Sequence, residues 1–344
     1  MLDMIKPQRL KFGDTLATIS LSSGMGGDKE ILWRYEQGKQ QLVELGFNVV
    51  ELPHTLSGTD YVYKNPQERA EDLHSALLDP DIKGIVSVIG GNDSYRIFEF
   101  LDLNILKNNP KVFIGYSDST SVHQFFQMAG VVSFYGPCLL VDFAENGGVM
   151  EFTRCCFEDV LMGKYDNYTY PWRTKWTSDI IPWIPDKKEH VRSVYQDEGP
   201  ILLQGHGVVE GRLIGGCLDV YSMLRGTSLY PSNETFEGGI LLLETSEKYP
   251  SPETVEQELR TMGVMGNLSK LHGILFGKPQ TNRYFEEYQT SIKKILKEFN
   301  LEKLPVLYNC NFGHTEPKWT IPLGIRARID LINKQLTLLE SPLV

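Results

Sequence analysis

The chain has 344 residues, of which 41% are hydrophobic and 23% charged, and its net charge is −10. This length predicts about two domains, and the composition is that of a folded chain rather than a disordered one. The acidic balance argues against a nucleic-acid or membrane-surface partner, because both of these present negative charge.

The N-terminal residues and the cysteines indicate a cytoplasmic protein. The opening MLDMIKPQRLKFGD lacks the apolar stretch of a secretory signal. No apolar run approaches the roughly 20 residues of a membrane span. The five cysteines are odd in number and show neither a CxxC pair nor a Cys/His metal spacing. They are typical of free thiols in a reducing cytosol, and we expect no metal site.

Strand and helix patterns alternate in the first half of the chain. They predict strands at 15–21, 47–52, 84–89 and 112–115, and helices at 30–45, 66–78, 93–101 and 119–128. Such alternation is typical of a parallel sheet covered by helices on both faces. We therefore expect an α/β protein whose N-terminal domain, residues 1–163, is Rossmann- or flavodoxin-like.

Residues 164–199 have no clear periodicity and contain several prolines. Aromatic residues are dense there: Tyr165, Tyr168, Tyr170, Trp172, Trp176 and Trp183. Long irregular segments are usually linkers or functional lids, and the aromatic content argues against a merely flexible linker. We expect a connecting loop that borders the active site.

Strands prevail in the remainder of the chain. The patterns predict strands at 207–213, 239–244, 273–276, 306–309, 327–330 and 335–339, and helices at 218–224, 251–262 and 284–299. We expect a second, β-rich and barrel-like α/β domain over residues 200–344.

A serine lies at a predicted strand-to-helix turn in the segment VFIGYSDSTSVHQFF. Ser117 follows the strand at 112–115 and directly precedes a helix. Catalytic sites of open α/β sheets collect at the carboxyl ends of strands, and helix N-terminal amides favour a developing oxyanion there. The layout resembles a nucleophile elbow, but it lacks the second glycine of G-x-S-x-G. The alternative is that Ser117 only caps the helix.

A glycine pair follows the preceding strand. Gly90 and Gly91, with Asn92 after them, let the backbone approach a ligand closely and expose amide protons. The Gly91 amide, together with that of Asp118, the residue after the serine, would form an oxyanion hole. A tight turn before a helix is the alternative.

One histidine and one glutamate stand out as partners for the serine. His314 lies in the irregular loop NCNFGHTEPKW after a strand, where an exposed imidazole suits a general base. Glu244 ends the apolar run GGILLLE at the mouth of a sheet, from which it could orient the imidazole. An ordinary loop histidine and a solvated strand end are the alternatives, and Glu247 competes with Glu244 for the orienting role.

Together these segments resemble the LD-carboxypeptidase family of serine peptidases, most closely its branch of microcin C self-immunity proteins. The resemblance runs through GDTLATISLSS, RAEDLHSALLDPDIKGIVSVIGGNDS, IGYSDST, KWTSD, EGRLIGGCLD, GGILLLETSE, FGKPQ and NFGHTEP. It rests on the order and spacing of these pieces over nearly the whole chain.

The resemblance implies a Ser-Glu-His triad of Ser117, Glu244 and His314 in a cleft between two domains. The implied reaction is acyl transfer through an acyl-enzyme, without a metal or other cofactor. It also implies a homodimer. One departure is Cys217, where the family usually has asparagine, and this puts in doubt any polar contact from that position.

The resemblance implies a peptidyl-aminoacyl-nucleotide antibiotic of the microcin C type as the substrate, and a muropeptide tetrapeptide of cell-wall recycling is the alternative. In the immunity branch a tryptophan of the aromatic loop stacks on the nucleobase, and KWTSD indicates Trp176 for this role. Lys248 is a further candidate contact for an anionic group. The aromatic residues could instead anchor the loop, and a noncatalytic two-domain binding protein is a third possibility.

Overall fold

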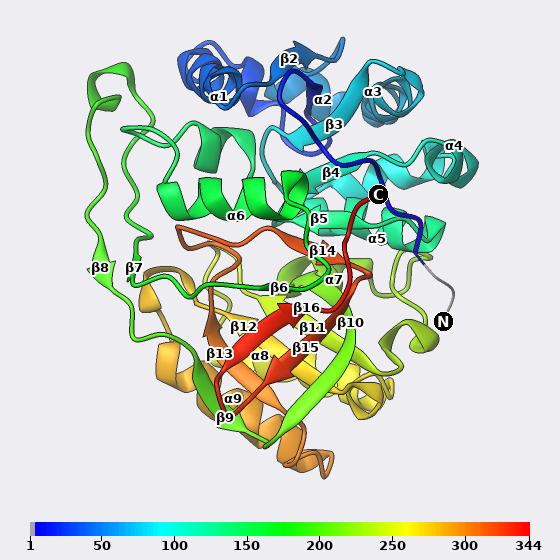
Figure 1. The fold of residues 1–344 in the computed structure, drawn as a ribbon, viewed down its shortest axis with the longest axis vertical. Coiled ribbons are helices and arrows are strands. Elements are labelled where there is room, and N and C mark those ends of the chain that lie inside the picture. The colour runs from blue at the N-terminus through cyan, green and yellow to red at the C-terminus, as the bar shows by residue number, and fades with distance from the viewer. Residues whose placement is uncertain (1–3) are drawn as a thin grey trace.

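A computed structural model describes residues 4–344, which form two sheets lying one above the other in Figure 1. The upper sheet has the strand order β14-β5-β4-β3-β1-β2. Its strands are β1 (Thr15–Ile19), β2 (Asn48–Glu51), β3 (Ile82–Ser87), β4 (Val112–Gly115), β5 (Ser133–Tyr135) and β14 (Ile321–Leu323). All neighbours are parallel except β14, which runs antiparallel to β5.

The order β2-β1-β3-β4-β5 is that of a flavodoxin-like sheet, so the prediction for the first domain is confirmed. In this topology the strand order reverses between β1 and β3, and ligands bind in the crevice outside the carboxyl ends of these strands. The segments after β1, β3 and β4 hold the two serines 22 and 23, the glycine pair and Ser117.

The helices of the first part are α1 (Leu32–Glu44), α2 (Thr59–Lys64), α3 (Pro66–Leu78), α4 (Leu103–Asn108), α5 (Ser119–Ala129) and α6 (Glu151–Met162). The helix predicted at 93–101 is instead a 3₁₀ segment, Ser94–Phe100. Its sequence SYRIFEF is rich in aromatic residues with modest helix propensity.

The lower sheet has the strand order β6-β16-β15-β10-β11-β12-β13-β9. Its strands are β6 (Tyr168–Thr169), β9 (Ile201–Gln204), β10 (Val208–Cys217), β11 (Gly239–Glu244), β12 (Gly273–Gly277), β13 (Val306–Cys310), β15 (Arg326–Asp330) and β16 (Gln335–Leu338). Strands β10 to β13 are parallel, and α7 (Leu218–Leu224), α8 (Pro252–Val264) and α9 (Phe285–Glu298) belong to this part. The predicted β-rich second part is therefore present.

Strand β10 is longer than predicted, because it stays paired with β11 as far as Cys217. A Cβ atom at Gly215 would lie only 2.0 Å from the carbonyl oxygen of Leu242. The glycine thus allows the backbones of β10 and β11 to approach closely. The strand therefore extends past residue 213, where the sequence pattern ended it.

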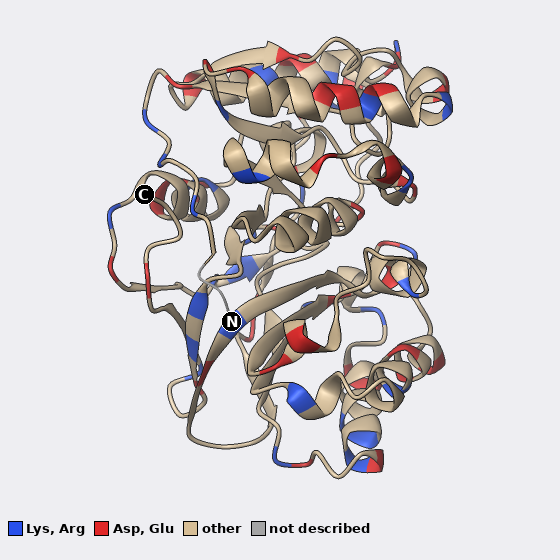
Figure 2. Cartoon of the chain, turned by 90° about the vertical axis from the view of Figure 1, so that its right-hand side faces the viewer, with Lys and Arg blue, Asp and Glu red and all other residues tan. Residues whose placement is uncertain are grey.

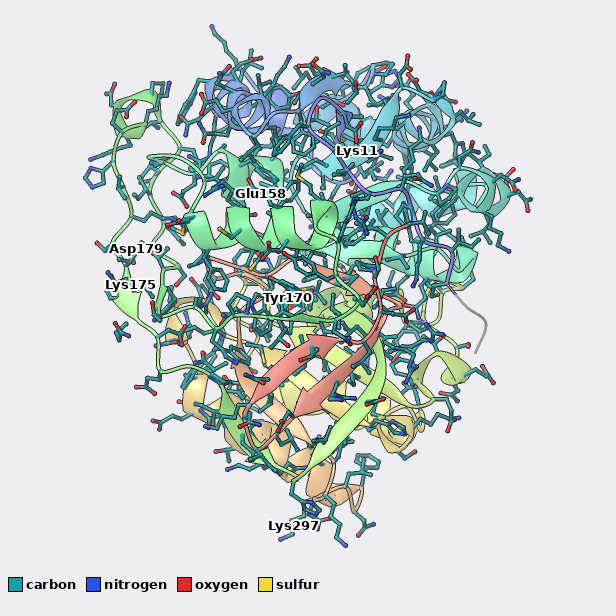
Figure 3. All side chains as sticks on the ribbon, in the orientation of Figure 1. Lys11, Glu158, Tyr170, Lys175, Asp179 and Lys297 are labelled. Carbon is teal, nitrogen blue, oxygen red and sulfur yellow. The ribbon has the colours of Figure 1, made fainter. Side chains whose placement is uncertain are left out.

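The connecting segment is an ordered hairpin rather than a structureless loop. β7 (Lys175–Trp176) pairs antiparallel with β8 (Tyr195–Gln196), and this hairpin stands beside both sheets in Figure 1. Figure 3 shows Lys175 and Asp179 on this hairpin at one side of the molecule, and Tyr170 between the two sheets.

The two sheets do not divide the chain at a single residue. β14 comes from the C-terminal part but joins the upper sheet, whereas β6, from the connecting segment, joins the edge of the lower sheet. The C-terminal region therefore crosses back to the first sheet, and the domain boundaries at residues 163 and 200 stay a prediction.

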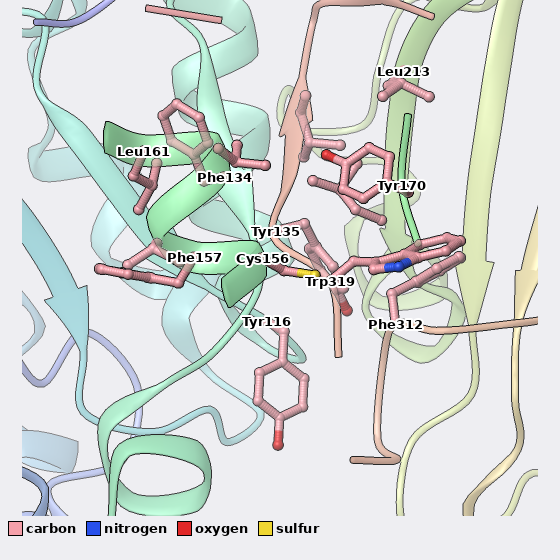
Figure 4. Close-up of a cluster of buried hydrophobic side chains, with 14 of the residues drawn as sticks. Tyr116, Phe134, Tyr135, Cys156, Phe157, Leu161, Tyr170, Leu213, Phe312 and Trp319 are labelled. Atoms are coloured by element: carbon pink, nitrogen blue, oxygen red, sulfur yellow. The ribbon is translucent and has the colours of Figure 1, made fainter. Parts of the chain in front are cut away.

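Aromatic side chains fill the space between the sheets. In Figure 4, Phe134 of β5 lies on one side and Tyr170, Phe312 and Trp319 lie on the other, with Tyr135 of β5 in the middle beside Trp319. All five are buried and belong to one hydrophobic cluster. Close-packed interiors of this kind resist displacement, so the cluster fixes the strand ends of one sheet relative to those of the other.

The surface carries both signs of charge. Figure 2 marks acidic and basic residues interspersed along the helices on the side that it presents, as is usual for solvated helix faces. Among residues 4–344, no helix is long and apolar enough to cross a membrane.

Candidate active site

The segments that follow parallel strands of both sheets border one cavity of about 370 Å³. From the upper sheet it is lined by Ser23 after β1, by Gly90 and Gly91 after β3, and by Ser117 after β4. From the lower sheet it is lined by His314, in the loop after β13, among others. The cavity thus lies at the strand-order reversal of the first sheet, where ligands of this topology bind.

Ser117 occupies a strained turn between β4 and α5. Its φ angle is 59°, in the left-handed region that non-glycine residues seldom adopt. Strain of this kind persists only where the surroundings hold it, and it collects at functional sites. Gly90 makes room for the serine, since a Cβ atom there would lie 3.0 Å from the Ser117 Cβ and 3.1 Å from its Oγ.

His314 joins Ser117 to Glu244. Its Nε2 lies 3.1 Å from the Ser117 Oγ, and its Nδ1 lies 2.7 Å from the Glu244 Oε2. Glu244 is fully buried and His314 is 7% exposed. Gly313 is needed beside them, because its φ is +93° and a Cβ atom would lie 2.6 Å from the same glutamate oxygen. The structure therefore brings together the three residues that the sequence assigned to the triad.

Tyr135 is a fourth member of this constellation, and the sequence did not reveal it. Its buried hydroxyl donates to the Glu244 Oε1 at 2.5 Å and accepts a hydrogen bond from the Ser117 amide at 3.1 Å. One hydroxyl thus ties the carboxylate of the lower sheet to the serine backbone of the upper sheet. In the sequence it is only the last residue of the short apolar run SFY.

Two carboxylates contact the histidine. Glu244 contacts Nδ1, whereas the Glu247 Oε2 lies 3.1 Å from Nε2. Burial lowers the pKa of His314, but the two carboxylates outweigh burial and raise this pKa to about 10. The hydrogen bond with His314 in turn lowers the pKa of Glu247 to about 2. Glu247 is therefore not an alternative to Glu244 but a second partner, on the opposite nitrogen.

The glycine-pair loop is anchored by Asp118. One oxygen of its buried carboxylate accepts hydrogen bonds from the hydroxyl of Ser22 and from the amides of Asp93 and Ser94. Burial raises the pKa of Asp118, which these hydrogen bonds oppose. Among residues 4–344, no hydrogen-bond acceptor is found for the backbone amides of Gly91 and Asp118.

The connecting segment supports the histidine loop. The buried guanidinium of Arg173 donates to the Pro317 carbonyl at 2.8 Å and to the Thr315 hydroxyl at 3.1 Å. It also pairs with Asp197 at 2.9 Å. The backbones of Thr177 and Glu316 exchange two hydrogen bonds.

Trp176 does not lie where the sequence analysis placed it. It is 6% exposed, it is absent from the cavity wall, and the Lys278 ammonium lies 4.3 Å from its ring centroid. Trp183 lines the cavity instead, with the Arg34 guanidinium 4.3 Å from its ring centroid. The reason is the β7–β8 hairpin: Trp176 is paired within it, whereas Trp183 lies in the irregular stretch that faces the cavity.

Other predicted contacts also lie outside the cavity wall. Asn92 and Lys248 are exposed residues that do not line it, in contrast to Gly90 and Gly91. Cys217 is buried, its thiol is 3.7 Å from the Asp219 carboxylate, and it does not line the cavity either.

Buried charges form the wall beyond the serine. Arg192 pairs with both Glu145 and Glu316, and Glu316 also pairs with Lys318 at 3.3 Å. The ammonium of Lys318 lies 3.5 Å from the ring centroid of Tyr116, whose ring packs edge-on against His314 at 5.1 Å. This network holds the aromatic residue that borders the imidazole.

Comparison with known proteins identifies the family. Residues 16–136 match the LD-carboxypeptidase N-terminal domain, and residues 210–329 match the LD-carboxypeptidase C-terminal domain. The chain belongs to the LD-carboxypeptidase family. The resemblance seen in its sequence is thereby confirmed, and the family is one of peptidases.

Its relatives include the microcin C7 self-immunity protein MccF of Escherichia coli. The chain is 30% identical to that protein, over 96% of its own length and 95% of MccF. A structure of MccF in complex with aspartyl sulfamoyl adenosine is similar with a TM-score of 0.87 at 30% identity, covering 99% of this chain and 100% of that one. An MccF-like protein from Streptococcus pneumoniae in complex with AMP also gives a TM-score of 0.87 at 30% identity, covering 95% of this chain and 98% of that one.

Proposed function

We propose that this LD-carboxypeptidase family member is a serine amide hydrolase that cleaves peptidyl- or aminoacyl-nucleotide conjugates of the microcin C type. The observation that carries the proposal is the chain of contacts from Ser117 through His314 to Glu244, with lengths of 3.1 Å and 2.7 Å, at the wall of the cavity.

In the proposed reaction His314 acts as general base. Its Nε2 takes the Ser117 proton while the Oγ attacks the scissile carbonyl, and Glu244 stabilises the imidazolium through Nδ1. Nε2 then protonates the leaving nitrogen as the amide bond breaks. Water hydrolyses the acyl-enzyme by the same route. Tyr135 supports the role of Glu244, because its hydroxyl fixes the second carboxylate oxygen.

The amides of Gly91 and Asp118 are the proposed oxyanion hole. Gly91 lines the cavity together with Ser117, and Asp118 follows Ser117 in the chain. Neither amide finds an acceptor among residues 4–344, which supports the proposal. Asp118 also anchors the glycine loop through its carboxylate, so that the loop is preorganised. Loss of one such donor typically lowers the rate by about 100- to 1,000-fold.

Two observations support a nucleotide conjugate as substrate. The relatives' structures contain AMP and aspartyl sulfamoyl adenosine. The cavity wall of this chain offers Trp183, and a base stacked on an aromatic ring gains roughly 1–3 kcal/mol. We assign to Trp183 the stacking role that the sequence suggested for Trp176.

The test is parallel hydrolysis of a muropeptide tetrapeptide and a peptidyl-sulfamoyl-adenosine. We expect faster cleavage of the nucleotide conjugate, and no cleavage of either by Ser117→Ala. Trp183→Ala should lose activity selectively on the nucleotide, while Trp183→Phe, which retains a ring, should keep most of it. Equal losses on both substrates in Trp183→Ala would remove the stacking role.

A fluorophosphonate probe separates an enzyme from a binding protein. The wild type should be labelled and Ser117→Ala should not. Ligand binding without any labelling of the wild type would contradict the proposed chemistry. We further propose a homodimer in the cytoplasm, on the family resemblance, and light scattering and cell fractionation test these two points.

A further inference from the structure

Glu247 lies next to the reacting atoms, but the proposed reaction gives it no role. It lies three residues beyond Glu244 in the loop after β11, and it lines the cavity. Its Oε2 is 3.1 Å from the His314 Nε2, the nitrogen that also lies 3.1 Å from the Ser117 Oγ. The side chain is 53% exposed, so it can move, unlike that of Glu244.

This contact and the proposed reaction require different protonation states. A carboxylate accepts hydrogen bonds, so Nε2 must carry a proton to contact Glu247. Nε2 needs a free lone pair to accept the proton of Ser117. With Glu244 on Nδ1 and Glu247 on Nε2, the imidazole is a cation between two anions. The ligand-free arrangement is therefore not the one that deprotonates Ser117, and Glu247 must leave Nε2 before reaction.

A ligand cation is the group that would draw Glu247 away. Of the three other carboxylates that line the cavity in the described part of the chain, those of Glu145 and Glu316 already share Arg192, and that of Asp179 accepts a hydrogen bond from the Tyr195 hydroxyl at 3.0 Å. For Glu247, His314 is the one ion-pair partner found within residues 4–344, and Lys248 acts on it only at longer range. A carboxylate beside the reacting atoms with no lasting cationic partner is suited to an ammonium group of the substrate.

The short distance between Glu247 and the reacting atoms determines which ammonium group of the substrate it can bind. Glu247 is within one hydrogen bond of the atom that takes the Ser117 proton, so its ligand must lie a few bonds from the scissile carbon. On the leaving side the nearest nitrogen is the scissile amide itself, which is uncharged. On the acyl side the nearest ionisable group is the α-amino group, attached to the carbon next to the scissile carbonyl.

We propose that Glu247 is a specificity-determining residue that binds the free α-ammonium group of the acyl residue, so that aminoacyl conjugates are preferred over N-acylated, peptidyl ones. The inference rests on the proposed function and narrows its substrate class. When the ammonium binds, Glu247 leaves Nε2, which releases its proton to solvent. The free Nε2 then accepts the Ser117 proton, the Oγ–carbon bond forms, and the proton passes to the leaving nitrogen as the carbon–nitrogen bond breaks.

The first test compares two substrates that differ only at the α-amine, glutamyl-sulfamoyl-adenosine and its N-acetyl derivative. We expect the wild type to prefer the free amine in kcat/KM by roughly ten-fold or more, the size expected for a hydrogen bond between charged groups. Glu247→Gln should lose most of this preference. Glu253→Gln, which removes an exposed carboxylate near the same loop, should retain it. An unchanged ratio in Glu247→Gln would overturn the proposal.

The second test uses a fluorophosphonate probe, which carries no ammonium group and so cannot displace Glu247. We expect Glu247→Gln to be labelled at Ser117 faster than the wild type, because Nε2 is no longer held protonated. Labelling at an equal or lower rate, with the variant folded by circular dichroism, would refute this step. If Glu247→Gln fails to fold, Glu247→Asp, which withdraws the carboxylate from Nε2, takes its place with the same expectation.

The outcomes separate this inference from the proposed function. Cleavage of both conjugates at equal rates by the wild type would reject the inference and leave the hydrolase intact. Cleavage of neither, with Ser117 still labelled, would reject the nucleotide substrate, and the probe comparison would then decide the role of Glu247 alone.

Discussion

Replacing Tyr135 by phenylalanine tests the link between the two halves of the site. The change removes one hydroxyl and leaves the ring in the aromatic cluster of Figure 4. The hydroxyl donates to a buried carboxylate oxygen at 2.5 Å, and such hydrogen bonds to charged groups contribute about 1.5–3 kcal/mol. It also accepts from the Ser117 amide at 3.1 Å, an interaction that contributes about 1 kcal/mol.

The expected loss in the free energy of unfolding is therefore about 3 kcal/mol, with a decrease in Tm of several degrees. Catalysis should suffer as well, because the Ser117 amide helps to hold the φ of 59° that presents the hydroxyl to His314. Displacements of about 1 Å cost about 100-fold in rate, so labelling by a fluorophosphonate should slow by roughly ten- to 100-fold.

Tyr170→Phe is the matched control. This buried tyrosine belongs to the same cluster, but its hydroxyl donates only to the Thr320 carbonyl, at 2.7 Å. We expect a loss of about 1 kcal/mol and an unchanged labelling rate. Thermal unfolding and time courses of labelling measure both quantities. A Tyr135→Phe variant that matches Tyr170→Phe in both would refute the idea that this hydroxyl joins the sheets at the active site.

Three further predictions concern the serine turn, the histidine loop and pH. Gly90→Ala should slow labelling by about 100-fold with little change in Tm, because its Cβ would press on Ser117 at 3.0 Å; unaltered kinetics would contradict this. Arg173→Gln should lower the free energy of unfolding by about 3–5 kcal/mol, because it removes the ion-pair partner of the buried Asp197 carboxylate. An unchanged urea midpoint would show that this ion pair does not stabilise the fold. The pKa of His314 is raised from 6.5 to about 10, so its stabilising contribution is complete below pH 6.5 and is lost as pH rises to about 10. Urea unfolding of the wild type and of His314→Asn should show a difference in the free energy of unfolding that becomes smaller between pH 6.5 and about 10. A difference that stays constant over this range would exclude a stabilising role for the charged imidazole.

The sequence patterns singled out each member of the proposed triad by its place after a strand, and the family resemblance then implied that the three act together. Ser117 follows an apolar strand and precedes a helix, and Glu244 ends a run of buried residues. His314 lies in a loop after β13. Parallel strands bring their carboxyl ends to one edge, which relates Glu244 to His314 within the lower sheet. Ser117 belongs to the upper sheet, and only the family resemblance placed it with the other two.

Tyr135 and Trp183 could not be predicted, for two different reasons. Tyr135 ends a three-residue strand of apolar and aromatic residues, and nothing local distinguishes its hydroxyl from that of any other buried tyrosine. In the connecting segment, which tryptophan faces the cavity depends on the pairing of β7 with β8. This pairing joins Lys175 to Gln196 and Trp176 to Tyr195 across an irregular stretch, and no periodicity in the sequence indicates it.

The return of the chain to the first sheet also has no local signal. β14 is the three-residue run Ile321–Leu323, and it pairs with β5, which lies far earlier in the sequence. Short apolar runs do not reveal their partners, because register and neighbour are set by long-range packing. The fold class was therefore accessible from the sequence, whereas the crossing between the two parts was not.

The division of the site between two sheets has a mechanical consequence. The upper sheet supplies Ser117, the glycine pair and Tyr135, whereas the lower sheet and its loops supply Glu244 and His314. Neither half holds a complete proton-transfer chain, so reactivity of the serine requires the two sheets to be packed together. β14 is placed to enforce this, because the strand leaves the histidine loop and enters the upper sheet beside β5, whose last residue is Tyr135. The proposed base, His314, is thus connected within a few residues of backbone to the sheet that carries the proposed nucleophile, Ser117.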